Sequence, residues 1–447
     1  MGFVIKMTFS YDDFLQVFTG KTYIYRQVFT PNRVIDPLVM SKMAESCKKL
    51  GAIEAFRALK SRLSDDYFYR LYPAQCASMS YARSAFPPYR FILPDVLADD
   101  WLAMVDYHKD YCRDHSIHQP LTAYIVHKLL GGGDEALALS IDGKSILTRA
   151  VDILLGGEKT EYLRRYLSQM MPQSRLLMQD EAARQLWKDL FYETAITAAL
   201  FHDTGYPWQY VGRLRGSIGK QDFNLSVEDL NVDHIYNTFR SRLVMYPLHG
   251  YTNPIYNSPA GWEKRIHELI KDAVSKTHGF PGALGFLYLN DLVRKDPSSR
   301  GEEVASFCFD WVAVGIMMHD MLKIYQGEEK VSPKYPFLRI DFERDPLSCV
   351  IALADVLEDF YRPRASFYKT AVSKTRVSVK YDIEAKATEL AVNGDVMTVK
   401  YHFGSAARAN TQRHFKQEEI EDYFDPGVGF VDISSLGLSR VKCECVR

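Results

Sequence analysis

Six segments in the middle of the chain carry apolar residues at helical spacing, and they constrain the fold more than any other feature of the sequence. They cover residues 120–130, 186–201, 262–276, 281–295, 307–318 and 346–361. Proline or tryptophan begins several of these segments, and glycine or proline follows several of them, as is typical of helix boundaries. We therefore expect a mainly α fold, in which a bundle of helices occupies the centre of the chain.

Proline-rich and alternating segments mark the two borders of this helical region. Pro87, Pro88 and Pro94 interrupt an aromatic stretch near residue 95. After Tyr368 the sequence "RVSVKYDI" alternates, and "NGD" follows at 393–395, which predicts a β-hairpin over residues 376–403. The later sequence "VGFVDIS" predicts one more strand. We thus expect three regions: a helical and aromatic N-terminal extension (1–95), a helical domain (96–370) and a small β-rich C-terminal subdomain (371–447).

The composition is that of an ordinary globular protein, with 47% hydrophobic and 25% charged residues among 447. A formal net charge of -1 shows no overall basic excess, so a nucleic-acid partner is not indicated. The seven cysteines lack paired spacings, which favours reduced thiols over a disulfide framework. The sequence has no signal-peptide layout and no apolar run long enough to cross a bilayer. We therefore expect a cytoplasmic protein without a membrane span.

The sequence "ALFHDTGYPW" places a histidine and an aspartate side by side at the end of an apolar helical segment. Gly205 and Pro207 are residues expected just beyond a helix C-terminus, so His202 and Asp203 should lie in the last turn. Neighbouring side chains near a helix end can reach one ion, and imidazole with carboxylate suits a borderline divalent metal. A solvent-exposed pair that caps the helix is the alternative for an isolated dipeptide.

Further histidines and a carboxylate stand at the ends of other expected helices. His115 and His118 are three residues apart before an apolar helix, and His278 lies at a junction between two helices. His319 ends an almost uncharged helix. Asp355 lies at the edge of the apolar face of another expected helix, and a carboxylate that is partly desolvated there needs a cation or hydrogen-bond donors. Each residue alone is compatible with a core histidine or a helix-end salt bridge. The order His, His-Asp, His, His, Asp on successive helices is more specific.

This order resembles that of the HD-domain metal-dependent phosphohydrolases, a helical superfamily whose ligands follow the pattern H…HD…D, with two intervening histidines in members that bind two metals. The similarity covers roughly residues 105–365 and depends on the motifs and their order. It implies an HD-domain helical bundle with two divalent ions (Mn, Fe, Co, Ni, Zn or Mg) and six ligands: His118, His202, Asp203, His278, His319 and Asp355. In this set Asp203 bridges the ions and takes part in catalysis. His115 resembles the histidine that phosphodiesterase-like members use as a general acid.

Cationic and aromatic residues near the expected ligands are candidates for binding a substrate. Arg213, Arg215 and Lys220 follow the first His-Asp pair closely, and Lys323 lies one turn beyond His319, so these four side chains are candidates to bind phosphates. Tyr206 is a candidate to stack on a nucleobase. A solvated basic loop, an exposed lysine and a core aromatic are the alternatives.

The function that the resemblance implies is hydrolysis of a nucleotide or a nucleotide-like phosphoester through a metal-activated water. The alternatives are a dNTP triphosphohydrolase, a nucleotide-sensing regulatory protein without turnover, and a helical protein whose histidines are structural. The segments that follow the two His-Asp dipeptides differ from those of cyclic-di-GMP phosphodiesterases and dNTP triphosphohydrolases, so the substrate stays open. The resemblance also leaves room for a homo-oligomer, or for a partner protein bound through the N- or C-terminal region.

Overall fold

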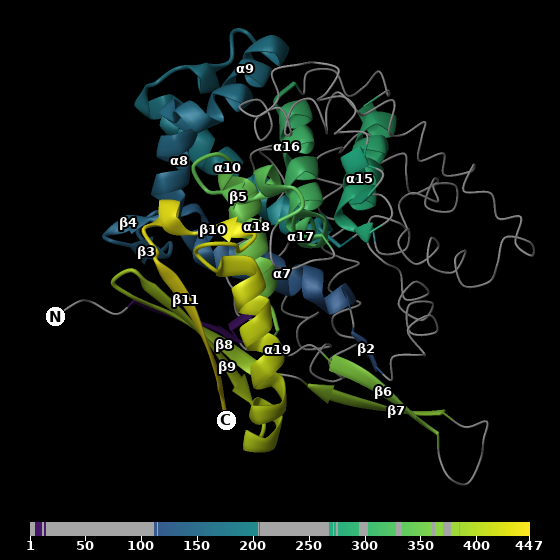
Figure 1. The fold of residues 1–447 in the computed structure, drawn as a ribbon. Helices are drawn as coiled ribbons and strands as arrows, with labels where there is room; N and C mark the ends of the chain where they lie inside the picture. The colour runs from purple at the N-terminus through teal and green to yellow at the C-terminus, as the bar shows by residue number, and fades with distance from the viewer. Residues whose placement is uncertain are drawn as a thin grey trace, which may run out of the picture.

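The computed structural model describes a helical body and a β-sheet at one end of it (Figure 1). The described residues are 5–10, 13–14, 111–113, 115–203, 205, 268–270, 272–273, 276–294, 303–327, 333–359, 363–369, 377–383 and 385–447. Most of them are helical, which confirms the expectation of a mainly α fold with a small sheet near the C-terminus.

Four helices form the centre of the body: α7 (His115–Leu129), α10 (Glu181–Phe201), α16 (Glu303–His319) and α18 (Pro346–Leu357). Helix α10 packs against the other three, α15 (Gly279–Arg294) packs on α16, and α8 (Ile146–Gly156) packs on α10. In α18 every residue except Asp355 is buried. A helix that is apolar on all sides belongs in the interior, and this accounts for the central position of α18.

Helix α10 begins earlier than its apolar spacing alone indicates, and side-chain caps mark the starts of both α10 and α18. Helix α10 starts at Glu181, where the side chain of Asp180 accepts a hydrogen bond of 2.8 Å from the backbone N–H of Ala183. Helix α18 starts at Pro346, and Asp345 accepts from the N–H of Ser348 at 3.0 Å. Such caps satisfy N–H groups that have no partner within the helix.

Smaller elements complete the helical body. Helices η3 (Glu158–Thr160) and α9 (Glu161–Met170) follow α8, and η4 (Arg175–Leu177) packs on α10. Helix α17 (Leu322–Gln326) follows α16 directly. No helix among the described residues combines the length and apolarity needed to cross a membrane.

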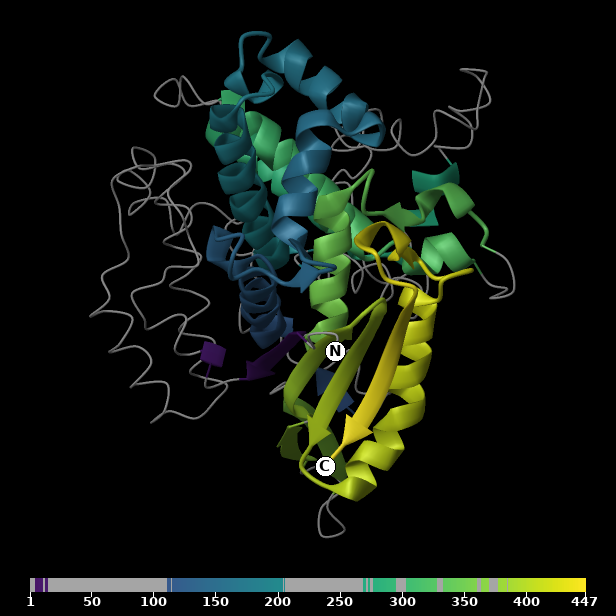
Figure 2. The same ribbon diagram turned by 90° about the vertical axis from the view of Figure 1, so that its left-hand side faces the viewer.

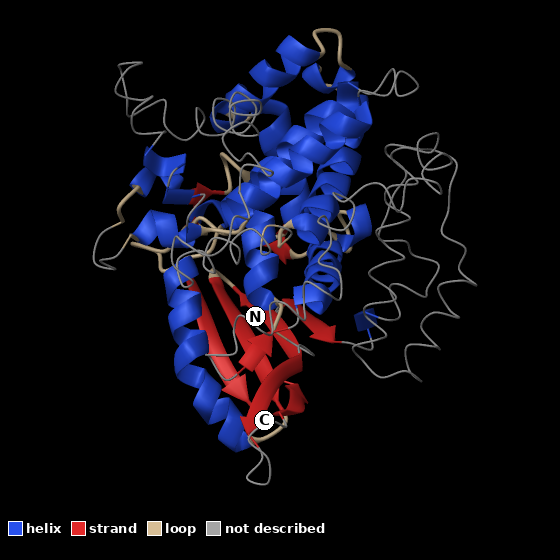
Figure 3. Ribbon diagram, turned by 90° about the vertical axis from the view of Figure 1, so that its right-hand side faces the viewer, coloured by secondary structure: helices blue, strands red, loops and turns tan. Residues whose placement is uncertain are grey.

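The main sheet has the strand order β1-β8-β9-β11 and is flanked by helix α19 (Figures 2 and 3). Its strands are β1 (Ile5–Ser10), β8 (Ala385–Asn393), β9 (Val396–Phe403) and β11 (Arg440–Val446). Strands β8 and β9 form the expected hairpin, and Gly394 in its turn has a φ of 60° that favours glycine. Strand β11 pairs parallel to β9, and α19 (Ala406–Phe424) connects the two.

Other strands of the C-terminal region differ from the expected hairpin over 376–403. Strand β7 (Val377–Ile383) pairs with β6 (Pro363–Lys369), which also pairs with β2 (Tyr111–Arg113), so it belongs to a separate sheet. The strand expected in "VGFVDIS" is β10 (Val431–Asp432), which pairs with β5 (Ile340–Asp341). The β2–β6 and β10–β5 pairings join segments far apart in the sequence, so local alternation could not predict them.

Two parts of the C-terminal unit were not expected from the sequence. Helix α19 buries only Ala409, Lys416, Ile420 and Phe424, and this narrow, partly polar stripe gives little helical periodicity to detect. Strand β1 comes from the N-terminal region, where a helical extension was expected, and pairs with β8. The remainder of residues 1–95 lies outside the described residues apart from 13–14.

Candidate metal centre

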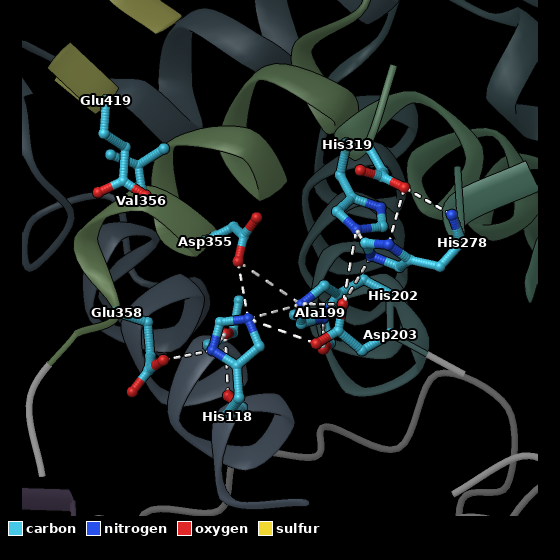
Figure 4. Close-up of polar contacts among 12 residues, drawn as sticks. His118, Ala199, His202, Asp203, His278, His319, Asp355, Val356, Glu358 and Glu419 are labelled. Atoms are coloured by element: carbon cyan, nitrogen blue, oxygen red, sulfur yellow. Dashed lines mark hydrogen bonds and ion pairs between the residues drawn. The ribbon is translucent and has the colours of Figure 1, made fainter. Parts of the chain in front are cut away.

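The six residues expected as metal ligands lie together, at or near the ends of helices (Figure 4). Five helices supply them: His118 from the first turn of α7, His202 and Asp203 directly after α10, His278 directly before α15, His319 at the end of α16 and Asp355 from the last turn of α18. All are buried except Asp355, whose side chain is 22% exposed. The cluster is therefore largely shielded from water and opens to solvent at Asp355.

The first group consists of His118, His202 and Asp355. The Nε2 atoms of the two histidines are 3.0 Å apart. The Oδ1 atom of Asp355 lies 2.7 Å from His118 Nε2 and 3.7 Å from His202 Nε2. One ligand atom from each residue falls within 4.8 Å of the others, which is compact enough to surround one ion.

The second group consists of His278, His319 and Asp203. The Nε2 atoms of its two histidines are 3.1 Å apart. The Oδ1 atom of Asp203 lies 3.0 Å from His278 Nε2 and 3.7 Å from His319 Nε2. This group repeats the composition of the first, with two imidazoles and one carboxylate.

Asp203 connects the two groups. Its Oδ1 atom faces His278, while its Oδ2 atom lies 3.6 Å from His118 Nε2 in the other group. His202 Nε2 is also only 3.3 Å from Asp203 Oδ1. A carboxylate with one oxygen toward each group has the geometry of a bridge between two ions.

The spacing and chemistry of the donors fit divalent metal ions. Two nitrogens that each lie about 2.1 Å from one ion, at a right angle, are about 3.0 Å apart. Both histidine pairs have this separation, 3.0 Å and 3.1 Å. A mixture of imidazole nitrogens and carboxylate oxygens suits Mn, Fe, Co, Ni and Zn. Mg and Ca prefer ligand sets made of oxygen alone, so this mixture suits them less well. The residues present therefore fit two ions.

Two of the imidazole rings are oriented by backbone carbonyls at helix ends. His202 Nδ1 donates to Ala199 O at 2.7 Å, and His319 Nδ1 donates to Ile316 O at 2.6 Å. A carbonyl oxygen can only accept, so the proton of each neutral ring lies on Nδ1 and leaves Nε2 free to donate its lone pair. Both rings are thus prepared as Nε2 ligands.

Burial and neighbouring charge have opposite effects within the cluster. Burial lowers the pKa of His202, which favours the neutral form that binds a metal. Burial alone would raise the pKa of Asp355, but hydrogen bonds from His118 and His202 hold it well below its usual range. For His278, burial lowers the pKa, but Asp320 and Asp203 overcome this effect and raise it to about 10. The negative charges of Asp203 and Asp320 therefore stabilise a positive charge in the cluster, as they would stabilise a bound cation.

Two glycines permit the close approach of the helix ends. A Cβ atom on Gly205 would lie 1.8 Å from the carbonyl oxygen of His278. A Cβ atom on Gly279 would lie 2.6 Å from the carbonyl oxygen of Ile316. Only residues without a side chain allow these backbones to touch, and this contact places Asp203 beside His278.

Of the remaining predicted site residues, the structure describes the side chain of Lys323 alone. Lys323 lies on α17, where it is exposed to solvent. The side chain of His115, the first residue of α7, lies outside the described residues, and so do four others entirely: Tyr206, Arg213, Arg215 and Lys220. Their roles stay predictions.

Tyr423 on α19 is a residue that sequence reasoning missed. Burial, together with the negative charges of Asp355, Asp320 and Asp203, raises its pKa well above the usual value. The phenol therefore stays protonated at neutral pH. It is about 70 residues beyond Asp355 in the sequence, and no local motif marks it.

No protein-family model matches the chain, and neither a curated protein nor a solved structure is detectably similar to it. The geometry of the cluster and the order of its residues along the chain are therefore the basis for proposing a function.

Proposed function

We propose that the chain is a metal-dependent phosphohydrolase of the HD-domain type, which hydrolyses a nucleotide or a nucleotide-like phosphoester. The observation that carries the proposal is the pair of His-His-carboxylate groups joined by Asp203, with Nε2 separations of 3.0 Å and 3.1 Å. Two divalent ions bound there would lower the pKa of a shared water toward neutrality and stabilise negative charge on a phosphoryl group.

The chain's own residues have distinct roles in this proposal. Asp203 keeps the two groups at a fixed separation, and the histidines present neutral Nε2 atoms. His115, at the start of α7, donates a proton to the leaving oxygen, which suits a group with an ordinary pKa of about 6.5. Lys323 binds phosphate, and three cations beyond the described residues share that role: Arg213, Arg215 and Lys220. Tyr206 stacks on the base.

The location of the enzyme is part of the proposal. We propose a cytoplasmic protein that acts on a small-molecule nucleotide. Among the described residues four cysteines are free thiols: Cys308, Cys349, Cys443 and Cys445. Free thiols are usual in a reducing compartment.

The experiment that tests the proposal compares wild-type protein with Asp203→Asn. Metal content is measured after purification without chelator, and release of phosphate or nucleotide is measured over dNTPs, NTPs and cyclic nucleotides with Mn, Co, Ni or Mg. We expect the wild type to bind two ions and to turn over substrate. We expect the variant to lose metal binding and turnover. Asp134→Asn is the matched control, because Asp134 is exposed at the opposite end of α7 and bonds only its own turn.

The other outcomes separate the alternatives. Turnover that releases triphosphate from dNTPs identifies a dNTP triphosphohydrolase. Bound metal and saturable nucleotide binding without turnover favour a nucleotide-sensing regulator. If the wild-type protein binds no metal and is not stabilised by added metal, the proposal is contradicted. That result would indicate that the histidines have a structural role.

A further inference from the structure

Two of the four imidazole rings are oriented by side-chain carboxylates that are not themselves in position to contact the ions. His118 Nδ1 donates to Glu358 Oε2 in a short hydrogen bond, visible in Figure 4. His278 Nδ1 lies 2.8 Å from Asp320 Oδ2. In both rings the carboxylate faces Nδ1, on the side opposite to the Nε2 atom that points into the cluster. Glu358 and Asp320 therefore lie behind the ligands.

The four rings differ in the kind of acceptor that faces Nδ1. The carbonyls without a partner inside a helix are those of its last turn. His202 and His319 stand at helix C-termini and use such carbonyls. His118 stands in the first turn of α7, and His278 lies between the helical residue Lys276 and α15. At both rings a side chain from another element faces Nδ1: Glu358 at His118 and Asp320 at His278.

Glu358 shares helix α18 with a ligand of the same ring. Asp355 contacts His118 at Nε2, 2.7 Å away, and Glu358 contacts the Nδ1 atom. The N–H of Glu358 still bonds to Ala354 O at 3.1 Å, so the residue caps the last turn of α18. Its side chain is fully buried. One helix turn thus holds the ring from both sides.

Asp320 gives a physical account of the second His-Asp dipeptide. In the first dipeptide the aspartate, Asp203, faces the cluster. In the second, Asp320 turns away and contacts His278 twice and Gly279 once. Its Oδ2 accepts from the backbone N–H of His278 at 2.6 Å and of Gly279 at 3.3 Å, and lies 2.8 Å from the Nδ1 atom of the His278 ring. It therefore caps α15 and orients the imidazole that precedes it.

We propose that Glu358 and Asp320 are positioning residues, one for each metal ion: Glu358 orients His118 in the first group, and Asp320 orients His278 in the second. This inference rests on the proposed metal-dependent function. A carboxylate that accepts a hydrogen bond from Nδ1 keeps the proton on that atom. It also makes Nε2 more basic, and therefore a stronger ligand for a metal ion. Removal of such a partner lowers metal affinity by about 10–100-fold. Because each carboxylate serves one group, each should affect one ion.

The test uses the full chain, stripped of metal and titrated with Mn²⁺ by calorimetry and electron paramagnetic resonance. Glu358→Gln and Asp320→Asn keep the size of each side chain but remove its charge. We expect each variant to retain one site of wild-type affinity and to weaken the other by about 10–100-fold. The spectrum of two coupled Mn²⁺ ions should appear only at higher metal concentration. A purely structural role would not move this spectrum in a protein that keeps its fold.

Matched variants separate the charge from the packing. Glu444→Gln, on the surface of β11, and Asp134→Asn are the controls and should bind two ions as the wild type does. Glu358→Asp and Asp320→Glu keep the carboxylate and should retain more affinity than the amide variants. Circular dichroism of the metal-free proteins shows whether each variant is folded. If one amide variant does not fold, the other still tests its own ion.

The outcomes distinguish this inference from the proposed function. Two ions in the wild type, with one weakened in each amide variant, support it. Affinities within about threefold of the wild type in folded amide variants overturn it, as does equal weakening in the amide and the acid-retaining variants. Loss of both ions in a folded single variant overturns the one-to-one assignment. Absence of metal binding in the wild type itself overturns the proposed function as well.

Discussion

Replacement of Gly205 by alanine tests the contact that brings the C-terminal end of α10 against His278. The added Cβ would lie 1.8 Å from His278 O and 2.6 Å from the backbone N of Gly282. Ordinary contact between such atoms needs about 3.5 Å, so the two backbones have to separate by roughly 1.5 Å. Because both obstructing atoms are backbone, no side chain can rotate away. We expect the variant to lose about 3 kcal/mol or more of unfolding free energy, at the upper end for overpacking.

The same displacement should disrupt the metal centre. Metal-ligand distances tolerate changes of only about 0.2 Å, and a shift above 1 Å moves Asp203 away from His278 Nε2, now 3.0 Å from its Oδ1. Urea denaturation in the presence of chelator measures the stability, and Mn²⁺ titration measures the site. We expect one ion of the two to be lost.

Gly285 provides the matched control, because a Cβ atom there meets nothing within 4 Å and the residue lies inside α15. Gly285→Ala should stabilise the protein by about 1 kcal/mol, since alanine favours a helix. The two substitutions thus have opposite expected signs. Equal stability of Gly205→Ala and wild type, with two ions retained, would refute the account of the close approach.

Two further predictions concern pH and a buried ion pair. With a pKa of about 10, His278 has to lose a proton to bind an ion, so Mn²⁺ affinity should rise with pH, by up to about tenfold per unit below that value; a calorimetric titration that is independent of pH contradicts this. Lys416→Met leaves the carboxylate of Asp359, 2.9 Å from the ammonium and 1% exposed, without its cation. Urea denaturation should show that the free energy of unfolding falls by about 3–5 kcal/mol. For the surface variant Lys400→Met it should fall by about 1 kcal/mol or less. Equal decreases in the two variants would count against a buried ion pair.

Much of the helical body could be predicted from the sequence, because its signals are local. Apolar residues at helical spacing located α7, α10, α15, α16 and α18, and the structure confirms these helices within a few residues. Gly205 was expected beyond the helix that carries His202 and Asp203, and α10 does end at Phe201. Periodicity and helix-stop residues depend on neighbours in the chain, so a single sequence is enough to read them.

The candidate site was predictable in part. The order of the histidines and aspartates selected six residues, and the structure brings all six side chains together, while their binding of metal stays a prediction. The orienting partners were not predictable. Glu358 and Asp359 are adjacent acidic residues after α18, yet one bonds His118 and the other pairs with Lys416 of α19. Which way each carboxylate points depends on helices 240 and 57 residues away along the chain.

The sequence by itself determined which segments are helical and that histidines and aspartates stand at their ends, because hydrophobic spacing and helix-end chemistry act over a few residues. Only the tertiary structure decided that strand β1 joins the C-terminal sheet, that α19 supplies Tyr423, and that Asp203 faces the cluster while Asp320 turns behind it. The physical reason is that strand pairing, glycine-mediated contacts and carboxylate partners form between elements distant in the chain. Such contacts depend on how the helices pack against one another, and the residue pattern of a single segment does not specify that packing.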